Sequence, residues 1–248
     1  MSATGLRSRA RGHQSRCFGY TARHTPLSPL PVTLAIFDLD ETLIAGDSDH
    51  LWGEYVVDAG LVDGEAYQRA NDGFFADYKA GKLDIHAYLG LVYSVLTAHP
   101  LETLLAHREL FVERCIVPIV LPNAIDLVEK HRQQGHELLC ITATSQFITE
   151  PIVRLFGIDD LIAPVPELAD GRYTGKTVGV PSYAEGKVTR LHSWLAGRAT
   201  TLADSYGYTD SINDVPLLKL VAHPHAVDPD ERLRAAALTA GWPVMSLR

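Results

Sequence analysis

Short apolar runs alternate with longer segments of helical periodicity along most of the chain. Five runs are expected to be strands: residues 32–37, 136–142, 201–209, 223–227 and 242–247. The segments between them repeat their apolar positions every three or four residues, which is typical of helices that cover a sheet. Strands separated by such helices predict a parallel sheet with helices on both faces, a Rossmann-like α/β fold.

The first two expected strands are separated by a long interruption, residues 47–118, that has a helical pattern throughout. Its apolar stripes end near Gly60, Gly81 and Pro100, residue types that terminate helices. The pattern predicts an inserted helical-bundle cap. The core of the fold would then consist of residues 32–46 and 119–248.

Two further expectations concern packing. The aromatic stripe Tyr67, Phe74 and Tyr78 is expected in the core of the bundle, because aromatic side chains on one helix face are most often buried. A segment rich in turn residues, 166–181, is expected to form a surface hairpin. Its sequence GRYTGKT is one residue short of the phosphate-binding Walker spacing, so it indicates a turn.

Composition fits an ordinary globular protein. The chain has 248 residues, of which 46% are apolar and 21% charged, enough for one α/β domain with an insertion. No apolar run reaches the roughly 20 residues that span a bilayer, so no membrane association is expected. Three cysteines without a CxxC pair favour neither a zinc site nor a disulfide framework, and a cytoplasmic location is expected.

Charge is unevenly distributed. Residues 1–31 contain five arginines and no acid, so the net charge of -8 divides into +5 for this tail and -13 for the rest. An Arg-rich, Ser-rich tail is compatible with a transit peptide or a nucleic-acid-binding arm. We favour a disordered tail or a start assigned too early, with Val32 as the alternative start, because low hydrophobicity and charge of one sign cannot build a core.

Acidic residues gather directly after the first expected strand, in the segment LAIFDLDETLIAGDSDH. Asp38 and Asp40 lie two residues apart at the carboxyl end of that strand, where open α/β sheets bind their ligands. The segment is not a calcium-binding EF-hand loop, because Leu43 occupies the position of the obligatory glycine. Carboxylates this close together repel one another, so a cation, a covalent partner or solvent must compensate them.

Four segments resemble, in order, the motifs of the haloacid dehalogenase superfamily of phosphatases. DLDET, residues 38–42, is similar to the first motif, DxDxT. CITATS contributes Thr142 at a strand end, and YAEGKVTRL contributes Lys187 at a helix start. YTDSINDVPLL contributes Asp210 and Asp214, four residues apart. Each match alone is weak, whereas four in order at the required places identify the chain as a member of the superfamily.

The resemblance implies a phosphomonoesterase that works through an aspartyl-phosphate. Asp38 would attack phosphorus, and Asp40 would protonate the leaving alkoxide and then deprotonate the hydrolytic water. Thr142 would donate a hydrogen bond to a phosphoryl oxygen, and Lys187 would neutralise the phosphate and the nucleophile. Asn213 is a further candidate for holding the phosphate.

The same resemblance implies a Mg²⁺ cofactor. Asp38, Asp210 and the main-chain carbonyl of Asp40 would hold the ion, whose remaining positions are filled by water and phosphate. Asp214 would orient those waters or bind the metal directly.

Several of these residues have simpler explanations when taken singly. Thr142 could satisfy a turn, Lys187 could be a solvated helix residue, and the two later aspartates could cap a helix. The presence of all of them favours catalysis. The histidines of HRQQGH (131–136) and HPH (223–225) lack the spacing of a metal site, so surface histidines are expected there.

Within the superfamily, the inserted helices resemble those of the phosphoserine phosphatase branch. Relatives there carry a glutamate nine positions after the nucleophile to hold the substrate's ammonium, and this chain has Asp47. They also use a cap arginine for the substrate carboxylate, whereas residues 82–107 contain none, and Arg69 and Arg108 do not match in position. The pattern favours a substrate that has an amine and lacks a carboxylate.

AGDSDHLWGEY and DIHAYLG also resemble members of this branch associated with histidinol phosphate hydrolysis, so histidinol phosphate is the expected substrate and phosphoserine the alternative. A binding protein that keeps the fold without catalysis is a different class, disfavoured because all the motif residues are retained. The acidic body would repel nucleic acid, so a small phosphorylated metabolite is the expected partner. The pattern leaves the oligomeric state open.

Overall fold

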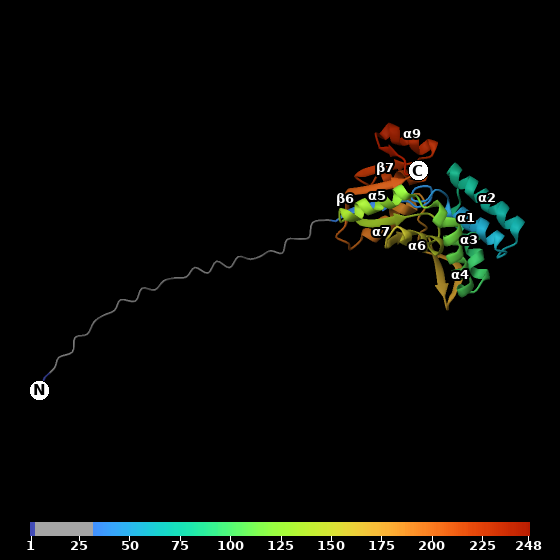
Figure 1. Ribbon diagram of the computed structural model, residues 1–248, viewed down its shortest axis with the longest axis horizontal. Helices are drawn as coiled ribbons and strands as arrows, with labels where there is room; N and C mark the ends of the chain where they lie inside the picture. Colours follow the sequence, from blue (N-terminus) through green and yellow to red (C-terminus); the bar gives the residue numbers. More distant parts are fainter. Residues whose placement is uncertain (3–31) are drawn as a thin grey trace. The chain divides into compact units, whose positions relative to one another are not determined.

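The computed structural model of the protein describes residues 1–2 and 32–248 (Figure 1). The basic tail expected over residues 1–31 therefore lies outside the described part of the chain, apart from its first two residues.

Six strands form one parallel sheet in the order β3-β2-β1-β6-β7-β8, which confirms the expected α/β class. The strands are β1 (Thr33–Phe37), β2 (Glu137–Ile141), β3 (Asp160–Ile162), β6 (Thr201–Thr209), β7 (His223–Val227) and β8 (Val244–Met245). Five of them lie within two residues of the predicted bounds. The edge strand β3 was not predicted, because its three residues carry too little pattern to be distinguished from a loop.

Helices cover both faces of this sheet. They are α5 (Pro122–Gln133), α6 (Gln146–Leu155), α7 (Glu185–Leu195), α8 (Val215–Leu218) and α9 (Glu231–Ala240). Side chains of β1 alternate between the two faces: Ile36 belongs to the same buried cluster as Leu191 of α7, and Phe37 belongs to that of Val128 of α5. The central strands are therefore buried on both sides, as expected for a parallel sheet.

The long interruption after β1 is helical, and Figure 1 shows its helices gathered at one side of the sheet. It contains α1 (Ser48–Asp58), α2 (Gly64–Ala80), α3 (Ile85–Ala98) and α4 (Leu101–Phe111), followed by a π-helical turn (Val112–Ile116) and a 3-10 turn (Val117–Ile119). Gly81 ends α2 in the left-handed conformation, at φ 68°.

The two ends of the helical interruption (the excursion, residues 47–118) meet. Ile44 and Val120 form an isolated antiparallel bridge. The amide of Ala45 donates to the carbonyl of Ile119 at 2.8 Å, and the amide of Leu121 donates to the carbonyl of Leu43 at 3.2 Å. The chain therefore leaves the sheet and returns to it at one point.

The aromatic stripe of α2 is only partly in the bundle core. Tyr67 is buried, as expected, whereas Phe74 and Tyr78 are half-buried and line a cavity that also contains Asp38 and Asp40. For these two residues the prediction was wrong. The sequence pattern marks an apolar face, but it does not say whether a second helix or a cavity lies against that face.

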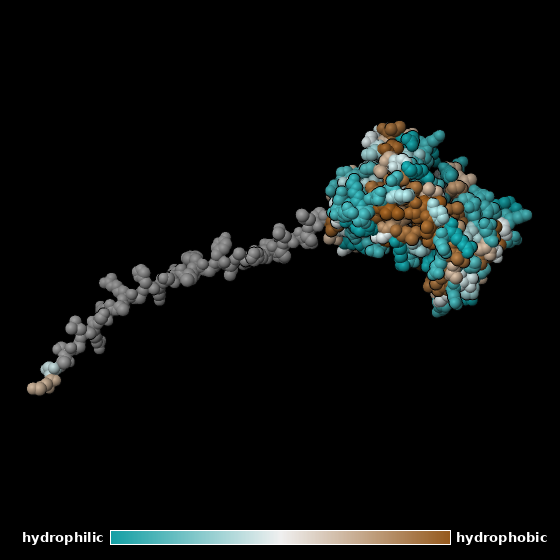
Figure 2. Space-filling view, viewed as in Figure 1, coloured by the Kyte–Doolittle hydropathy of each residue, from teal (hydrophilic) through white to brown (hydrophobic). Residues whose placement is uncertain are grey.

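The expected hairpin is confirmed as β4 (Val165–Ala169) and β5 (Arg172–Val178), which pair antiparallel. Most of the visible surface is hydrophilic, with an apolar area near the centre of this view (Figure 2). Within the described residues no single helix is long and apolar enough to cross a membrane; only the pair Ile85–Ala98 and Leu101–Ile119, bent by 117°, meets the length and composition criteria.

Candidate active site

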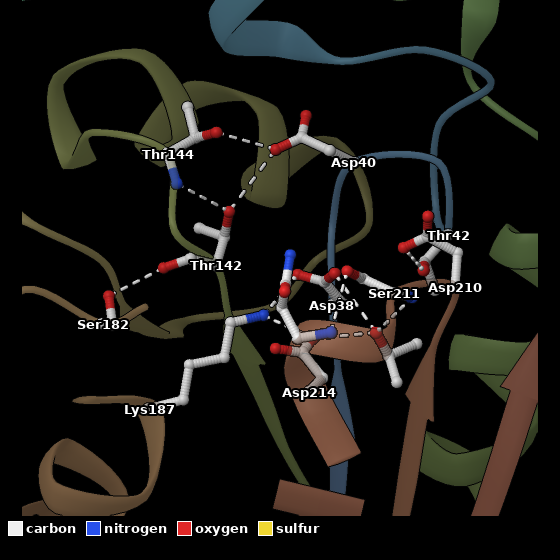
Figure 3. A network of polar contacts seen from close by, with 12 residues as sticks. Asp38, Asp40, Thr42, Thr142, Thr144, Ser182, Lys187, Asp210, Ser211 and Asp214 are labelled. Carbon is white, nitrogen blue, oxygen red and sulfur yellow. Dashed lines mark hydrogen bonds and ion pairs between the residues drawn. The ribbon is translucent and has the colours of Figure 1, made fainter. Parts of the chain in front are cut away.

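The residues singled out in the sequence follow three neighbouring strands. Asp38 comes directly after β1, Thr142 directly after β2, and Asp210 directly after β6. Because β1 pairs with both β2 and β6 in parallel, the three strands end at the same edge of the sheet. Figure 3 shows that the side chains at this edge lie close to one another.

Lys187 joins two of the carboxylates. Its Nζ lies 3.0 Å from Oδ1 of Asp38 and 2.6 Å from Oδ2 of Asp214, and all three side chains are buried. Lys187 lies in the first turn of α7, as the sequence predicted. Burial alone would lower the pKa of this lysine, but the charges of Asp214 and Asp38 outweigh burial and raise it. The ammonium is therefore held charged beside Asp38.

Two threonines hold the acids of this group in place. The Thr209 hydroxyl donates to Oδ2 of Asp214 at 2.8 Å and lies 3.4 Å from Oδ2 of Asp38. The Thr42 hydroxyl donates to Oδ1 of Asp210 at 3.3 Å. The sequence motifs do not single out Thr209, although its place as the last residue of the strand before Asp210 is a usable signal.

Asp40 is held by a second set of donors. Its Oδ1 accepts from the amide of Ser48 at 2.7 Å, and its Oδ2 accepts from the hydroxyls of Thr144 at 2.8 Å and Thr142 at 3.4 Å. The Thr142 hydroxyl itself accepts from the amide of Thr144 at 3.1 Å. Figure 3 shows Asp40, Thr142 and Thr144 beside the Lys187 cluster and separate from it. Ser48 and Thr144 were not singled out in the sequence.

Burial makes these carboxylates weak acids. Burial, and then repulsion by Asp214 and Asp40, raise the pKa of Asp38 to about 7, although Lys187 acts to lower it. Burial and then repulsion by Asp47 raise the pKa of Asp40 to about 7. The pKa of Asp210 is raised well above its usual value by burial and by repulsion from Asp38 and Asp214. One lysine therefore cannot compensate these carboxyl groups when all of them are ionised.

This donor set fits Mg²⁺. Among the described residues, no three side chains of His, Cys, Asp or Glu are arranged as a complete metal site. The available donors are carboxylate oxygens of Asp38 and Asp210 and the main-chain oxygen of Asp40, all hard ligands of the kind that Mg²⁺ prefers. Oδ2 of Asp214 is already occupied by Lys187 and Thr209, so this residue suits an outer position better than a direct one.

A cavity connects this edge with the helices of the excursion. Asp38, Asp40 and Thr142 line one side, and side chains from α2 and α3 and from the start of α1 line the other. Asp47 is the N-cap of α1, where its Oδ1 accepts from the amide of His50 at 2.8 Å, and it lines the cavity as well. The sequence-predicted catalytic acids and Asp47 are thus brought to one space.

Asn213 lies apart from that cavity. It lines an adjoining groove with Asp210 and Lys79, and its Nδ2 lies 3.5 Å from the carbonyl of Tyr78. The two arginines considered for binding a carboxylate are elsewhere: Arg69 pairs with Glu65 on the surface, and Arg108 donates to the carbonyl of Phe147 at 3.0 Å. No arginine is among the described residues that line the cavity.

Of the histidines expected at the surface, His223 is exposed, whereas His131 is part of a packed array. His131 is buried; its Nδ1 lies 2.8 Å from Nδ1 of His136 and its Nε2 lies 2.9 Å from the hydroxyl of Tyr208. His225 stacks on Tyr208 with ring centres 4.6 Å apart. The prediction was wrong for His131, because one turn of α5 facing the sheet places it over Tyr208 of β6. None of these histidines lines the cavity.

A parallel sheet that ends in paired aspartates, beside a buried lysine and under a layer of helices, defines an enzyme of the α/β class with a carboxylate-based site. The chain belongs to the family of haloacid dehalogenase-like hydrolases, whose pattern matches residues 35–219. The family and the enzyme class expected from the motifs are confirmed.

Relatives extend along most of the chain. A histidinol-phosphatase from Neisseria meningitidis serogroup C (strain 8013) is 45% identical over 220 residues, which cover 87% of this chain and 99% of that protein. A crystal structure of a protein of unknown function from Bordetella pertussis Tohama I is 41% identical, with a TM-score of 0.83 over 88% of this chain and 100% of that one. A substrate-bound phosphoserine phosphatase, 18% identical, shares the fold with a TM-score of 0.64 over 88% of this chain and 93% of that one.

Proposed function

We propose that the protein is a Mg²⁺-dependent phosphomonoesterase whose substrate is histidinol phosphate, a small phosphate monoester with an amine and no carboxylate. The observation that carries the proposal is the placement of Asp38, paired with Lys187 at 3.0 Å, in one cavity with Asp40 and Asp47. The 45% identity with a histidinol-phosphatase over nearly the whole of that relative supports the choice of substrate.

In the first step, a carboxylate oxygen of Asp38 attacks phosphorus, the bond to the alkoxide breaks, and an aspartyl-phosphate forms. Lys187 lowers the repulsion between the anionic nucleophile and the anionic phosphate, since its ammonium touches Asp38 directly. Asp40 donates its proton to the leaving alkoxide. Burial and repulsion by Asp47 raise the pKa of Asp40, which favours the protonated form that this step needs.

In the second step, Asp40, now ionised, takes a proton from a water molecule that attacks the phosphorus of the aspartyl-phosphate, which releases phosphate and regenerates Asp38. Ser48 and Thr144 hold the two oxygens of Asp40, so the carboxyl group keeps one orientation in both steps. Thr142 donates a hydrogen bond to a phosphoryl oxygen, and Asn213 helps to hold the phosphate from the adjoining groove.

Mg²⁺ would be held by Asp38, Asp210 and the main-chain oxygen of Asp40, with Asp214 in an outer position. When bound, it neutralises phosphate charge and lowers the raised pKa values of the buried acids.

We further propose that residues 47–118 act as a cap over the core formed by 32–46 and 119–248, and that the cap selects the substrate. Asp47 at the start of α1 would bind the substrate's ammonium. The cavity has no arginine among its described lining residues, which disfavours a substrate carboxylate. Phosphoserine stays the alternative substrate, since Lys79 lines the adjoining groove and offers a cation to a carboxylate there.

Phosphate release from purified protein with Mg²⁺ tests the proposal. Histidinol phosphate, phosphoserine and p-nitrophenyl phosphate would be compared for wild type, Asp38→Asn and Asp58→Asn, the last an exposed control on α1. We expect the highest kcat/KM for histidinol phosphate, loss of turnover in Asp38→Asn with the fold retained, and no effect of Asp58→Asn. Faster turnover of phosphoserine would overturn the substrate, and turnover by Asp38→Asn would overturn the nucleophile.

A further inference from the structure

Asp49 is a buried acid that the mechanism above does not use. It is the second residue of α1, its exposed fraction is 4%, and it lines the same cavity as Asp38 and Asp40. Its Oδ1 is buried and accepts no hydrogen bond from any described residue. Burying a carboxylate oxygen that accepts no hydrogen bond costs free energy. We therefore expect a bound ligand to supply the missing donor.

Asp49 differs in this respect from Asp47, two residues earlier. Asp47 caps α1, and its Oδ1 accepts from the amide of His50 at 2.8 Å. Asp47 therefore has a structural role whether or not a substrate is bound, whereas Oδ1 of Asp49 accepts no hydrogen bond from the described fold. The start of α1 presents two carboxylates to one cavity, and only Asp47 caps the helix by a hydrogen bond.

Aromatic rings surround the cavity around Asp49. Phe74 and Tyr88 line it with ring centres 5.3 Å apart, and Phe75 lines it beside them. Aromatic faces attract cations and stack on flat rings. The described residues that line the cavity include no lysine, arginine or histidine. Burial and then repulsion by Asp47 and Asp40 raise the pKa of Asp49 well above its usual value, while a hydrogen bond from Tyr88 acts to lower it. An arriving cation would relieve this repulsion.

We propose that Asp49 is a specificity-determining residue that accepts a hydrogen bond from a second nitrogen of the substrate, a flat N–H ring lying against Phe74 and Tyr88, while Asp47 binds the amine. The inference rests on the proposed function and deepens it. The site takes phosphate monoesters of amino alcohols that carry a nitrogen heterocycle, and it discriminates against those that end at the amine.

The kinetic test compares two substrates that share the amine and differ in the ring: histidinol phosphate and O-phosphoethanolamine. In Asp49→Asn, the ratio of kcat/KM for histidinol phosphate to that for O-phosphoethanolamine should fall about 30-fold, mainly through KM, because a charged hydrogen bond to the ring is lost. In the matched control Asp58→Asn, an exposed acid of the same helix, the ratio should stay at the wild-type value. Equal losses for both substrates in Asp49→Asn would overturn the proposal.

A binding measurement separates this inference from the proposed function. Calorimetry with L-histidinol, which has both nitrogens and no phosphate, should give a Kd about 30-fold weaker for Asp49→Asn than for wild type. Absence of L-histidinol binding to wild type would overturn the role of Asp49. Binding that depends on Asp49, together with no release of phosphate from any monoester, would support this inference and overturn the proposed function.

Thermal unfolding tests whether Asp49 has only a structural role. Replacing a buried carboxylate that has an unpartnered oxygen by a neutral amide should leave Tm unchanged or raise it. A lower Tm for Asp49→Asn, with the substrate ratio unchanged, would show that Asp49 serves the fold and not the substrate.

Discussion

Gly186 lies so close to Pro181 that a Cβ on this glycine would overlap the carbonyl oxygen of the proline. Gly186 directly precedes Lys187 in the first turn of α7, so this close approach fixes where the lysine side chain starts. The absence of a side chain at position 186 is therefore tied to the ion pair at Asp38.

Gly186→Ala should lower both stability and activity. The overlap is with backbone, so the start of α7 must move, and Lys187 moves with it. We expect kcat to fall at least about 10-fold and the free energy of unfolding to fall by about 1–3 kcal/mol. Initial rates with p-nitrophenyl phosphate and urea unfolding measure the two effects.

Gly90→Ala is the matched control, since Gly90 is an exposed residue within α3 and a Cβ there meets no atom within 4 Å. It should leave activity unchanged and stabilise the protein by about 0.5–1 kcal/mol. Equal behaviour of the two variants would show that the approach to Pro181 does not position Lys187.

Lys187→Met should destabilise the fold, because it leaves Asp38 and Asp214 buried without their cation. Removing one partner of a buried ion pair typically costs about 3–5 kcal/mol. The loss should be partly recovered in Lys187→Met/Asp214→Asn, which removes one of the uncompensated charges, while both variants lack activity. Urea unfolding of the single and double variants measures this recovery. If the double variant regains no free energy of unfolding, the expected repulsion between the acids is contradicted.

Gly53→Ala should weaken the contact between α1 and α2. A Cβ at Gly53 would overlap the amide of Asn71, a buried residue whose Nδ2 donates to the carbonyl of His50 at 3.0 Å. We expect a loss of about 1–3 kcal/mol in the free energy of unfolding. Gly73→Ala in α2 is the control, since a Cβ there lies in open space. A fall in Tm of the same size in both variants would argue against this packing account.

The imidazole of His131 should make stability depend on acid pH. Burial, and then repulsion by His136, lower its pKa to about 4 from a usual value of 6.5. The unfolded chain therefore binds a proton on His131 more tightly than the folded protein does. The contribution of His131 to the free energy of unfolding is lost as pH falls from about 6.5 to about 4. Relative to His131→Gln, wild type should lose about 2–3 kcal/mol between pH 7 and pH 4.5.

The comparison with His131→Gln matters because the buried acids of the active site titrate in the opposite sense. Their raised pKa values stabilise the folded protein as pH falls, and this contribution is common to both proteins. His192→Gln, at an exposed position of α7, should behave like wild type. Parallel pH profiles for wild type and His131→Gln would show that His131 is not held neutral by its surroundings.

Sequence predicted the parallel sheet and the edge that carries the acids, because both depend on short-range pattern. The apolar run before Asp38 marks a buried strand, and Lys187 follows turn residues that start a helix. These signals are local in the chain and need no knowledge of packing.

The residues that orient the acids could not be predicted in this way. Thr144 and Ser48 contact Asp40 only because the loop after β2 and the start of α1 meet at the sheet edge. The same holds for His131, whose burial depends on Tyr208 of a strand 77 residues later. Pairings of this kind are set by tertiary structure, which no single stretch of sequence encodes.

The closed base of the helical excursion has an evolutionary consequence. Because the chain departs and returns at the pairing of Ile44 with Val120, the part proposed to select the substrate is one uninterrupted stretch of the gene. Under that proposal, a change of metabolite would arise from mutations within this stretch, while most residues that break the phosphate ester lie outside it. Ser48 is the exception, since its amide holds Asp40.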